Sequence, residues 1–544
     1  MRRQNLLATL LMFAILSGCK QQEPTDLTKE SIIPKPVAVS ATTKSFEFTD
    51  KTGIFMAGSG PELQFVAEYL AEHLKPATGF EFNVTSNQNT PPSGSISLTL
   101  SDGDAELGDE GYQIDISEEQ LKITARKPAG LFYAVQTIRQ LLPAKIELKS
   151  KQEGPWRIAT GSIHDFPTYP FRASMLDVAR HFFSVEDVKR YMDLISMYKL
   201  NVLHLSLSND QGWRIEIKSW PKLATFGGST EVGGGEGGYY TQEQYKDLIK
   251  YAQDRFITVI PEIDMPGHTN AALASYPELN CNGKTPKLYT GIEVGFSSLC
   301  TTNELVYKFI SDVVKEMSEM TPGPYLHIGG DESHSTKREL YIPFVARVRD
   351  IVKENGKQVI GWEETAQINM NEKRPEETVQ ADSKSKASAA SAIAQFWSNP
   401  SHALEAVANG SKLVMSPAKK MYLDMQYDST TKLGLHWAAY IEVDSSYIWN
   451  PTTYVKGITR ENILGIEAPV WTETITNMKE LEYMAFPRII GLAEIAWSPE
   501  EGRGWDEYKI RLGRQAERLK NLNINYYASK KVPWVETPAE PAKP

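Results

Sequence analysis

Residues 325–332 read Tyr-Leu-His-Ile-Gly-Gly-Asp-Glu, a short apolar run that ends in two glycines and two carboxylates. The run predicts a buried strand, and the glycines allow the backbone to turn after it. Asp331 and Glu332 therefore follow the strand and can face a common cleft. In barrels of parallel strands, catalytic residues lie at this end of the strands. The stretch therefore predicts one strand of such a barrel, followed by two candidate catalytic carboxylates.

Seven further apolar runs resemble this one and are separated by segments of helical pattern. This alternation indicates βα units around a parallel sheet. Eight such strands predict a (β/α)8 TIM barrel over residues 157–530. The predicted strands are Ala173–Val178, Val202–Leu207, Ile257–Ile263, Tyr325–Ile328, Gln358–Trp362, Ile393–Trp397, Lys412–Met415 and Ile463–Pro469.

Residues 32–156 have a mixed pattern and predict a smaller α+β domain in front of the barrel. Tyr112–Ile116 and Leu121–Ala125 alternate apolar and polar residues, as half-buried strands do. Residues 61–74 place their apolar side chains on one face of a helix. The fold class is therefore α/β, a TIM barrel preceded by a smaller α+β domain.

The first residues predict export. Two arginines precede an apolar run from Leu6 to Leu16, and Ser17-Gly18-Cys19 follows, so residues 1–18 read as a signal peptide. Leu16 to Cys19 resembles a bacterial lipobox, which implies lipidation of Cys19 and a lipoprotein in the periplasm or on the cell surface, at the outer membrane. The alternative is ordinary secretion with a coincidental cysteine. Residues 19–31 would form a polar tether, and residues 531–544 a proline-rich tail.

The remaining two cysteines indicate a disulfide, and the overall charge indicates which kinds of partner to exclude. Cys281 and Cys300 are expected to pair in an oxidising compartment, the alternative being two reduced buried thiols. The formal net charge of the 544-residue chain is −10. An acidic body without a basic stripe argues against a nucleic-acid partner. The sequence does not indicate an oligomeric state.

Polar and aromatic residues collect at the predicted strand ends. Cleavage of a glycosidic bond needs an acid and a nucleophile, which are usually two carboxylates on different strands. Asp331 and Glu332 are sequence neighbours and can hardly flank opposite faces of a sugar, so we expect one to position the substrate while the other performs acid/base chemistry. The collected residues are Asp210, Asp264, His268, Asp331, Glu332, Trp362, Trp397, Tyr422, Asp424, Trp471 and Glu473.

Seven motifs in order resemble the β-N-acetylhexosaminidases of glycoside hydrolase family 20. Each motif alone is weak evidence, but the ordered set is highly specific and spans about residues 32–500. The motifs are His164-Asp-Phe-Pro-Thr-Tyr-Pro-Phe-Arg172, Asp210-Gln-Gly-Trp-Arg214, Pro261-Glu-Ile-Asp-Met-Pro-Gly-His268, His327-Ile-Gly-Gly-Asp-Glu332, Gly361-Trp-Glu363, Trp471-Thr-Glu473 and Pro487-Arg-Ile-Ile-Gly-Leu-Ala-Glu-Ile-Ala-Trp497.

The resemblance implies substrate-assisted catalysis with retention of configuration. The 2-acetamido oxygen of the sugar would attack the anomeric carbon and give an oxazolinium ion. Asp331 would orient the acetamido N–H. Glu332 would protonate the departing oxygen and later deprotonate water, which requires it to be protonated initially and therefore to have a raised pKa.

The resemblance also assigns the other contacts with the sugar. Arg172 is similar to the family arginine that binds ring hydroxyls, and Asp424 and Glu473 would bind the O4 and O6 side. These contacts would close the far end of the pocket and favour exo action. Trp362, Trp397 and Trp471 would enclose the acetamido methyl group, and Tyr422 would donate a hydrogen bond to its carbonyl oxygen.

Further residues are expected to support the site. Asp210 and His268 resemble a pair that lies beside Glu332, with the aspartate fixing the imidazole tautomer. Asp264 is expected to lie behind them. We expect Glu363 and Glu364 to be structural or exposed.

The predicted function is an exo-acting retaining β-N-acetylhexosaminidase that hydrolyses terminal β-linked N-acetylglucosamine or N-acetylgalactosamine from oligosaccharides. Alternatives are a disaccharide-releasing enzyme of the same family, a non-catalytic sugar-binding lipoprotein and a metal-dependent deacetylase. His327 and His334 lack the helical spacing of zinc ligands, so we expect neither a metal nor another cofactor.

Overall fold

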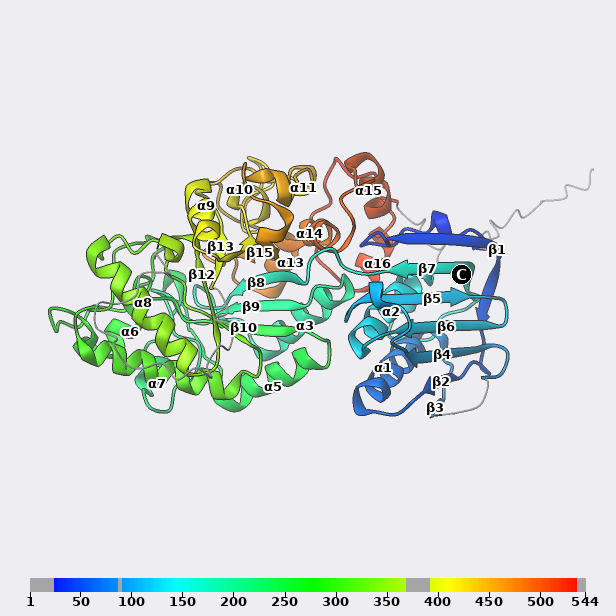
Figure 1. Cartoon of the computed structure of the whole chain (residues 1–544), viewed down its shortest axis with the longest axis horizontal. Helices are drawn as coiled ribbons and strands as arrows, with labels where there is room; N and C mark the ends of the chain where they lie inside the picture. The colour runs from blue at the N-terminus through cyan, green and yellow to red at the C-terminus, as the bar shows by residue number, and fades with distance from the viewer. Residues whose placement is uncertain (1–23, 87–90, 368–391, 536–544) are drawn as a thin grey trace, which may run out of the picture.

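The computed structural model describes residues 24–86, 91–367 and 392–535. It contains a barrel and a smaller domain beside it, at the left and right of Figure 1. The predicted signal peptide, Cys19 and residues 536–544 of the predicted tail lie outside the described residues. Among the described helices, none combines the length and apolar character needed to cross a membrane.

The N-terminal domain is a seven-stranded mixed sheet in the order β1-β7-β5-β6-β4-β2-β3. Two helices, α1 and α2, contact each other and pack on the sheet. The elements are β1 (Ala38–Phe48), β2 (Ile54–Ala57), α1 (Pro61–Thr78), β3 (Val84–Ser86), β4 (Ser95–Leu100), β5 (Tyr112–Ile116), β6 (Gln120–Ala125), α2 (Pro128–Leu141) and β7 (Trp156–Asp165).

The boundary between the domains differs from the predicted position at residue 156. Strand β7 pairs with β1 and β5, so it belongs to the N-terminal sheet and not to the barrel. Its apolar pattern does not reveal its partners, because the pairing joins segments far apart in the sequence. The change of domain therefore falls after Asp165.

Eight parallel strands close the barrel in the order β10-β11-β12-β13-β14-β15-β8-β9. Each overlaps one of the eight predicted runs, so the predicted TIM barrel is confirmed. The runs are apolar because the strands are covered on both faces. They are β8 (Phe171–Asp177), β9 (Val202–Ser206), β10 (Thr258–Glu262), β11 (Tyr325–His327), β12 (Gln358–Trp362), β13 (Ile393–Phe396), β14 (Lys412–Met415) and β15 (Ile463–Val470).

Helices surround the barrel, and side-chain caps fix where several of them begin. Ser184 and Asp187 form a reciprocal capping box at the start of α3, and Asn303 caps α7. The longer helices of this part are α3 (Val185–Met197), α5 (Gln242–Gln253), α7 (Glu304–Met320), α8 (Arg338–Glu354), α9 (Pro400–Ala408), α13 (Met478–Ala485), α14 (Arg488–Trp497) and α15 (Trp505–Gly513). The short ones are α4 (Lys222–Thr225), α6 (Asn270–Ser275), α10 (Ala418–Met421), α11 (Val443–Tyr447), α12 (Pro451–Tyr454) and α16 (Ala516–Asn521).

The two domains meet at the end of the barrel where its strands begin. Arg172, at the start of β8, binds Glu110 of the N-terminal domain through two hydrogen bonds of 2.8 Å. Lys199, just before β9, lies 3.0 Å from Asp165 at the end of β7. All strands of the barrel run the same way, so the opposite end carries their C-terminal loops.

The predicted disulfide is confirmed, because Cys281 is bonded to Cys300. It closes a loop at the C-terminal end of the barrel.

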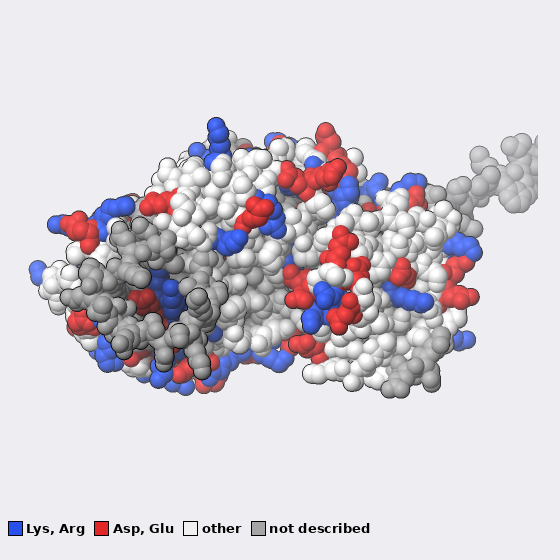
Figure 2. Space-filling model, in the orientation of Figure 1, with Lys and Arg blue, Asp and Glu red and all other residues white. Residues whose placement is uncertain are grey.

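On the face drawn in Figure 2, acidic and basic side chains are interspersed in small groups over both domains.

Candidate active site

The turn after β11 presents the two adjacent carboxylates. Gly329 and Gly330 have φ angles of 64° and 101°, in the region that favours glycine. A Cβ at Gly329 would lie 1.9 Å from Oδ1 of Asp264, so no larger residue fits there. Asp264 in turn accepts a hydrogen bond of 3.0 Å from the Gly330 N–H. Asp264 therefore supports the turn from behind, as expected.

Asp331 and Glu332 line a cavity of about 210 Å³. It lies at the C-terminal end of the barrel and also receives residues that follow β8, β13, β14 and β15. The lining residues are Arg180, Ile292, Val294, Asp331, Glu332, Trp397, Tyr422, Asp424, Leu435, Trp437, Trp471 and Glu473. Seven of the predicted site residues thus meet around one cavity.

His268 connects Glu332 with Asp210. Nε2 of His268 lies 3.3 Å from Oε2 of Glu332, and Nδ1 lies 3.6 Å from Oδ2 of Asp210. Asn209, which was not among the predicted site residues, is closer to Nδ1 at 3.2 Å. His268 and Glu332 both have positive φ angles, 52° and 45°. Such conformations are costly for non-glycine residues and cluster at functional sites.

The pKa values of the carboxylate pair differ from the expectation. Burial raises the pKa of Asp331 to about 6, opposed by the His268 charge and assisted by the Glu332 charge. Burial also acts to raise the pKa of Glu332, but the hydrogen bond and charge of His268 outweigh it and hold this pKa below its ordinary value. The predicted raised pKa of Glu332 is therefore wrong for the free enzyme. Because the two carboxyl groups interact, they titrate together, and the proton needed for catalysis is shared between Asp331 and Glu332.

Arg172 is not in the cavity, which corrects its predicted role. It is fully buried and donates to Glu110, Lys199 O and Tyr169 O at the opposite end of the barrel. These contacts make it an interdomain residue.

Arg180, three residues after the end of β8, takes the place in the cavity that was predicted for Arg172. It lies over the Trp471 ring at 4.7 Å, and Nε is 3.9 Å from Oε1 of Glu473. Although burial lowers the pKa of Arg180, the charges of Asp177 and Glu473 raise it above its ordinary value. Nε and Nη1 have no hydrogen-bond partner among the described residues. Nη1 lies 3.6 Å from Oδ2 of Asp177, and because Arg180 lines the cavity, its guanidinium can meet hydroxyl groups there.

Acidic groups stand beside Arg180. Asp424 and Glu473 line the cavity, and burial raises the pKa of both carboxyls. Oδ2 of Asp424 and Oδ1 of Asp331 have no hydrogen-bond partner among the described residues. A guanidinium and several carboxyl groups around one cavity suit a ligand with several hydroxyl groups.

Aromatic rings form another part of the cavity. Tyr422, Trp397 and Trp471 line it, as predicted. Trp362 lies deeper, only 1% exposed, with its ring 5.8 Å from that of Trp471 and its Nε1–H donated to Glu262. Trp437 was missed and lines the cavity at its mouth with 57% of its surface exposed. It follows no strand end, so the sequence carried no positional signal for it.

Glu363 and Glu364 hold Trp397 at both ends. Glu363 accepts hydrogen bonds from the backbone N–H groups of residues 397, 398 and 399. Both carboxylate oxygens of Glu364 lie 3.2 Å from Nε1 of Trp397, and burial raises the pKa of Glu364 to about 8. Glu363 and Glu364 therefore have a structural role, as expected, because they hold Trp397, which forms one wall of the cavity.

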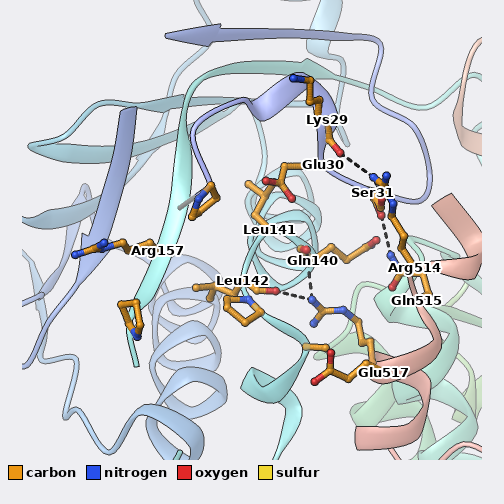
Figure 3. A pocket seen from close by; sticks show the side chains of 15 residues that line it. Lys29, Glu30, Ser31, Gln140, Leu141, Leu142, Arg157, Arg514, Gln515 and Glu517 are labelled. Carbon is orange, nitrogen blue, oxygen red and sulfur yellow. Dashed lines mark hydrogen bonds between the residues drawn. The ribbon is translucent and has the colours of Figure 1, made fainter. Parts of the chain in front are cut away.

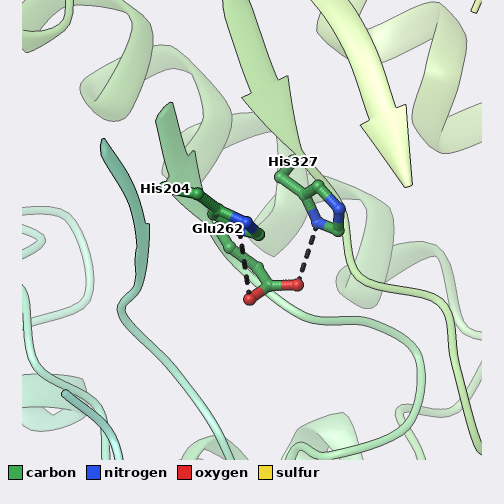
Figure 4. Close-up of side chains that lie close together, drawn as sticks. All are labelled: His204, Glu262 and His327. Carbon is green, nitrogen blue, oxygen red and sulfur yellow. Dashed lines mark ion pairs between the residues drawn. The ribbon is translucent and has the colours of Figure 1, made fainter. Parts of the chain in front are cut away.

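A buried polar layer lies beneath the site, inside the barrel. Oε1 of Glu262 lies 2.9 Å from Nδ1 of His327, and Oε2 lies 3.4 Å from Nε2 of His204 (Figure 4). Nδ1 of His204 lies 2.9 Å from Oε1 of Glu467. His327 therefore faces Glu262 and not the catalytic pair. Two groups of described residues lie close enough together to share a metal ion. They are His204, Glu262 and His327, and separately Asp264, His268 and Asp331. In the first group Glu262 forms ion pairs with both histidines, and in the second His268 lies 3.8 Å from Asp331.

A second cavity, of about 310 Å³, lies between the N-terminal domain and the last helices (Figure 3). Arg514 donates to Ser31 Oγ there, and burial raises the pKa of Glu30 to about 7. The residues that line this cavity include none of the predicted catalytic or sugar-binding residues.

Comparison with known protein families decides what kind of site this is. Residues 169–500 match the model of the glycosyl hydrolase family 20 catalytic domain, and residues 29–166 match domain 2 of the same family. The chain belongs to glycosyl hydrolase family 20. It is therefore a glycoside hydrolase, and its two matched regions meet at the boundary that follows β7.

Individual members of family 20 resemble the chain over nearly its whole length. A β-N-acetylhexosaminidase of Cellulomonas fimi is 37% identical over 508 residues, which is 93% of this chain and 97% of that protein. The solved family 20 β-N-acetylhexosaminidase of Streptomyces coelicolor A3(2) is 47% identical, with a TM-score of 0.87, and the match covers 94% of this chain and 100% of that one. A mutant β-hexosaminidase of Streptomyces plicatus, solved with the product GlcNAc, is 47% identical with a TM-score of 0.86, and the match covers 94% and 99% of the two chains.

Proposed function

We propose that the chain is an exo-acting, retaining β-N-acetylhexosaminidase that releases terminal β-linked N-acetylglucosamine or N-acetylgalactosamine from oligosaccharides or glycans. The observation that carries this proposal is the small cavity, which Arg180, Asp424 and Glu473 line together with the catalytic pair and several aromatic side chains. A cavity of about 210 Å³ suits a single sugar unit whose hydroxyls bind these groups, so we expect cleavage at the chain end.

The acetamido group of the sugar supplies the nucleophile in this proposal. Its methyl group packs against Trp397 and Trp471, and the hydroxyl of Tyr422 donates to its carbonyl oxygen. Asp331 accepts the acetamido N–H and so strengthens the attack of the oxygen on the anomeric carbon. Glu332 gives its proton to the leaving oxygen, and the oxazolinium ion forms without a bond to the enzyme. Water, deprotonated by Glu332, then opens the ring with net retention.

Hydrolysis of paired substrates tests the proposal. We expect release of 4-nitrophenol from the β-N-acetylglucosaminide but at least about a hundredfold lower kcat/KM for the β-glucoside, which lacks the acetamido group. Equal kcat/KM values would refute substrate assistance. Products from chitin oligomers distinguish release of a monosaccharide from release of a disaccharide. Acetate release from an intact linkage, or the absence of any turnover, would favour the deacetylase or the non-catalytic sugar-binding protein.

We also propose that the protein is exported and anchored in a membrane, at the periplasmic or cell-surface side, through a lipid on Cys19. The lipobox-like Leu16 to Cys19 and the apolar run before it support this proposal. Cell fractionation tests it. The activity of the native chain should sediment with membranes, and Cys19→Ser should release it to the soluble fraction or leave it unprocessed. A variant that is processed and still sediments with membranes as the wild type does would refute the lipid anchor.

A further inference from the structure

Ser297 lies in the loop that the Cys281–Cys300 disulfide closes, and it reaches the charged array behind Glu332. Its hydroxyl donates a hydrogen bond of 2.5 Å to Oδ1 of Asp210 and accepts one of 2.8 Å from the Thr269 N–H. Ser297 is only 4% exposed. One buried hydroxyl therefore joins the loop to Asp210 and to the residue that follows His268.

Two donors hold the same oxygen of Asp210. Besides the Ser297 hydroxyl, the Asn270 N–H donates to Oδ1 at 2.9 Å. The other oxygen, Oδ2, is consequently directed at His268, 3.6 Å from Nδ1. Oδ2 has no hydrogen-bond partner among the described residues. The orientation of the carboxylate is thus set on the side away from the histidine.

His268 transmits this orientation to the catalytic pair. Its Nε2 lies 3.3 Å from Oε2 of Glu332 and 3.8 Å from Oδ2 of Asp331. The imidazole is buried and its pKa is raised well above its ordinary value, because Asp331, Asp210, Glu332 and Asp264 outweigh the effect of burial. Asp210 at 3.6 Å and Asn209 at 3.2 Å both contact Nδ1, so Asp210 is one of two groups that orient the imidazole towards Glu332.

The loop is also fixed close to His268. The Leu299 N–H donates to Pro266 O at 2.9 Å, in the turn that carries His268. The Ser335 hydroxyl donates to Gly295 O at 2.8 Å, shortly after the catalytic pair. Ile292 and Val294 of the same loop line the cavity. The loop thus reaches both the cavity and the groups behind it.

We propose that Ser297 is a positioning residue for acid/base catalysis, whose hydroxyl directs Asp210 towards His268 and thereby holds Glu332 in place for proton transfer to the leaving group. This rests on the proposed function, because it assumes that Glu332 is the acid. The role differs from packing, since a methyl group at the same position would fill nearly the same space.

The test compares Ser297→Ala with the matched control Ser298→Ala. Ser298 is the neighbour in the loop, and its hydroxyl donates to Leu299 O and lies close to Thr336, away from Asp210. Substrates are chitobiose, whose sugar leaving group needs the acid, and the 4-nitrophenyl β-N-acetylglucosaminide, whose activated leaving group needs it little. Thermal unfolding of each variant reports folding.

We expect Ser297→Ala to lower kcat/KM for chitobiose about tenfold and for the aryl substrate about twofold or less, a loss typical of one hydrogen bond to a charged group. Ser297→Thr, which keeps the hydroxyl, should recover most of the loss, and Ser297→Cys, a weak donor, should be intermediate. Ser298→Ala should remain within about twofold of the wild type on both substrates.

Equal losses on both substrates, or a Ser297→Ala variant that resembles Ser298→Ala, would overturn the role of Ser297. Failure of Ser297→Thr to exceed Ser297→Ala would also count against it. Inactivity of the wild type on both substrates would instead refute the proposed function, so the two failures are distinct.

Discussion

Replacing Arg180 by Met should separate sugar binding from folding. The change keeps a flexible apolar side chain near Trp471 and removes a buried guanidinium. The guanidinium of Arg180 lines the cavity, and we expect it to donate two charged hydrogen bonds to the sugar. At about 1.5–3 kcal/mol each, their loss amounts to about 3–6 kcal/mol. This corresponds to a fall in kcat/KM of about 10²- to 10⁴-fold.

Arg172→Met is the matched comparison, because it removes a buried guanidinium at the other end of the same strand. Both variants are assayed with the 4-nitrophenyl β-N-acetylglucosaminide after their unfolding temperatures have been measured. We expect Arg172→Met to lower the unfolding temperature, because it leaves Glu110 without its partner, at a cost of about 3–5 kcal/mol. Its kcat/KM, measured well below that temperature, should stay within about threefold of the wild type. An Arg180→Met enzyme within tenfold of the wild type, or an equal loss in both variants, would refute the assignment.

Further predictions concern the catalytic pair and the layer beneath it. Glu332→Gln should lose about 10²-fold or more on chitobiose and much less on aryl glycosides, whereas Asp331→Asn should be impaired on both; the same leaving-group dependence in both variants would contradict the division of roles. In the wild type, kcat/KM requires one proton on the pair, so it should fall as the pH rises through about 6 and again as the pH falls through the lowered pKa of Glu332. A pH–rate profile that stays flat up to pH 8 would be incompatible with this. Burial lowers the pKa of His204, but the charges of Glu467 and Glu262 outweigh burial and raise this pKa from 6.5 to about 10. Protonated His204 therefore stabilises the folded state fully below pH 6.5, and this contribution is lost as the pH rises towards 10, by up to about 1.4 kcal/mol per pH unit. Unfolding temperatures in a pH series should therefore fall less over this range in His204→Gln, and parallel curves would exclude the effect.

The barrel could be predicted because its strands are buried on both faces and therefore stand out as apolar runs. All eight, from Ala173–Val178 to Ile463–Pro469, overlap a strand of the structure. The limit of the N-terminal domain could not be predicted in the same way. Strand β7 looks like any other strand, and its partners β1 and β5 are known only once the sheet has formed.

The site was predictable where chemistry followed the end of a strand, as at Asp331 and Glu332. Arg172 was assigned from a motif, although it lies at the beginning of β8, whereas Arg180 satisfies the positional rule. The pKa of Glu332 depends on His268, which arrives from a different strand end. Trp437 reaches the cavity from a long loop. Such contacts arise from tertiary packing and leave no local pattern.

The ion pairs between the domains constrain how the protein can be divided. Arg172 and Lys199 belong to the barrel half, and both are fully buried. Their carboxylate partners, Glu110 and Asp165, belong to the N-terminal half. Cutting the chain after β7 would leave two interior cations without counter-charges in the catalytic half. Although no described residue of the smaller domain lines the cavity, these ion pairs lead us to expect that the barrel is stable only with the smaller domain attached.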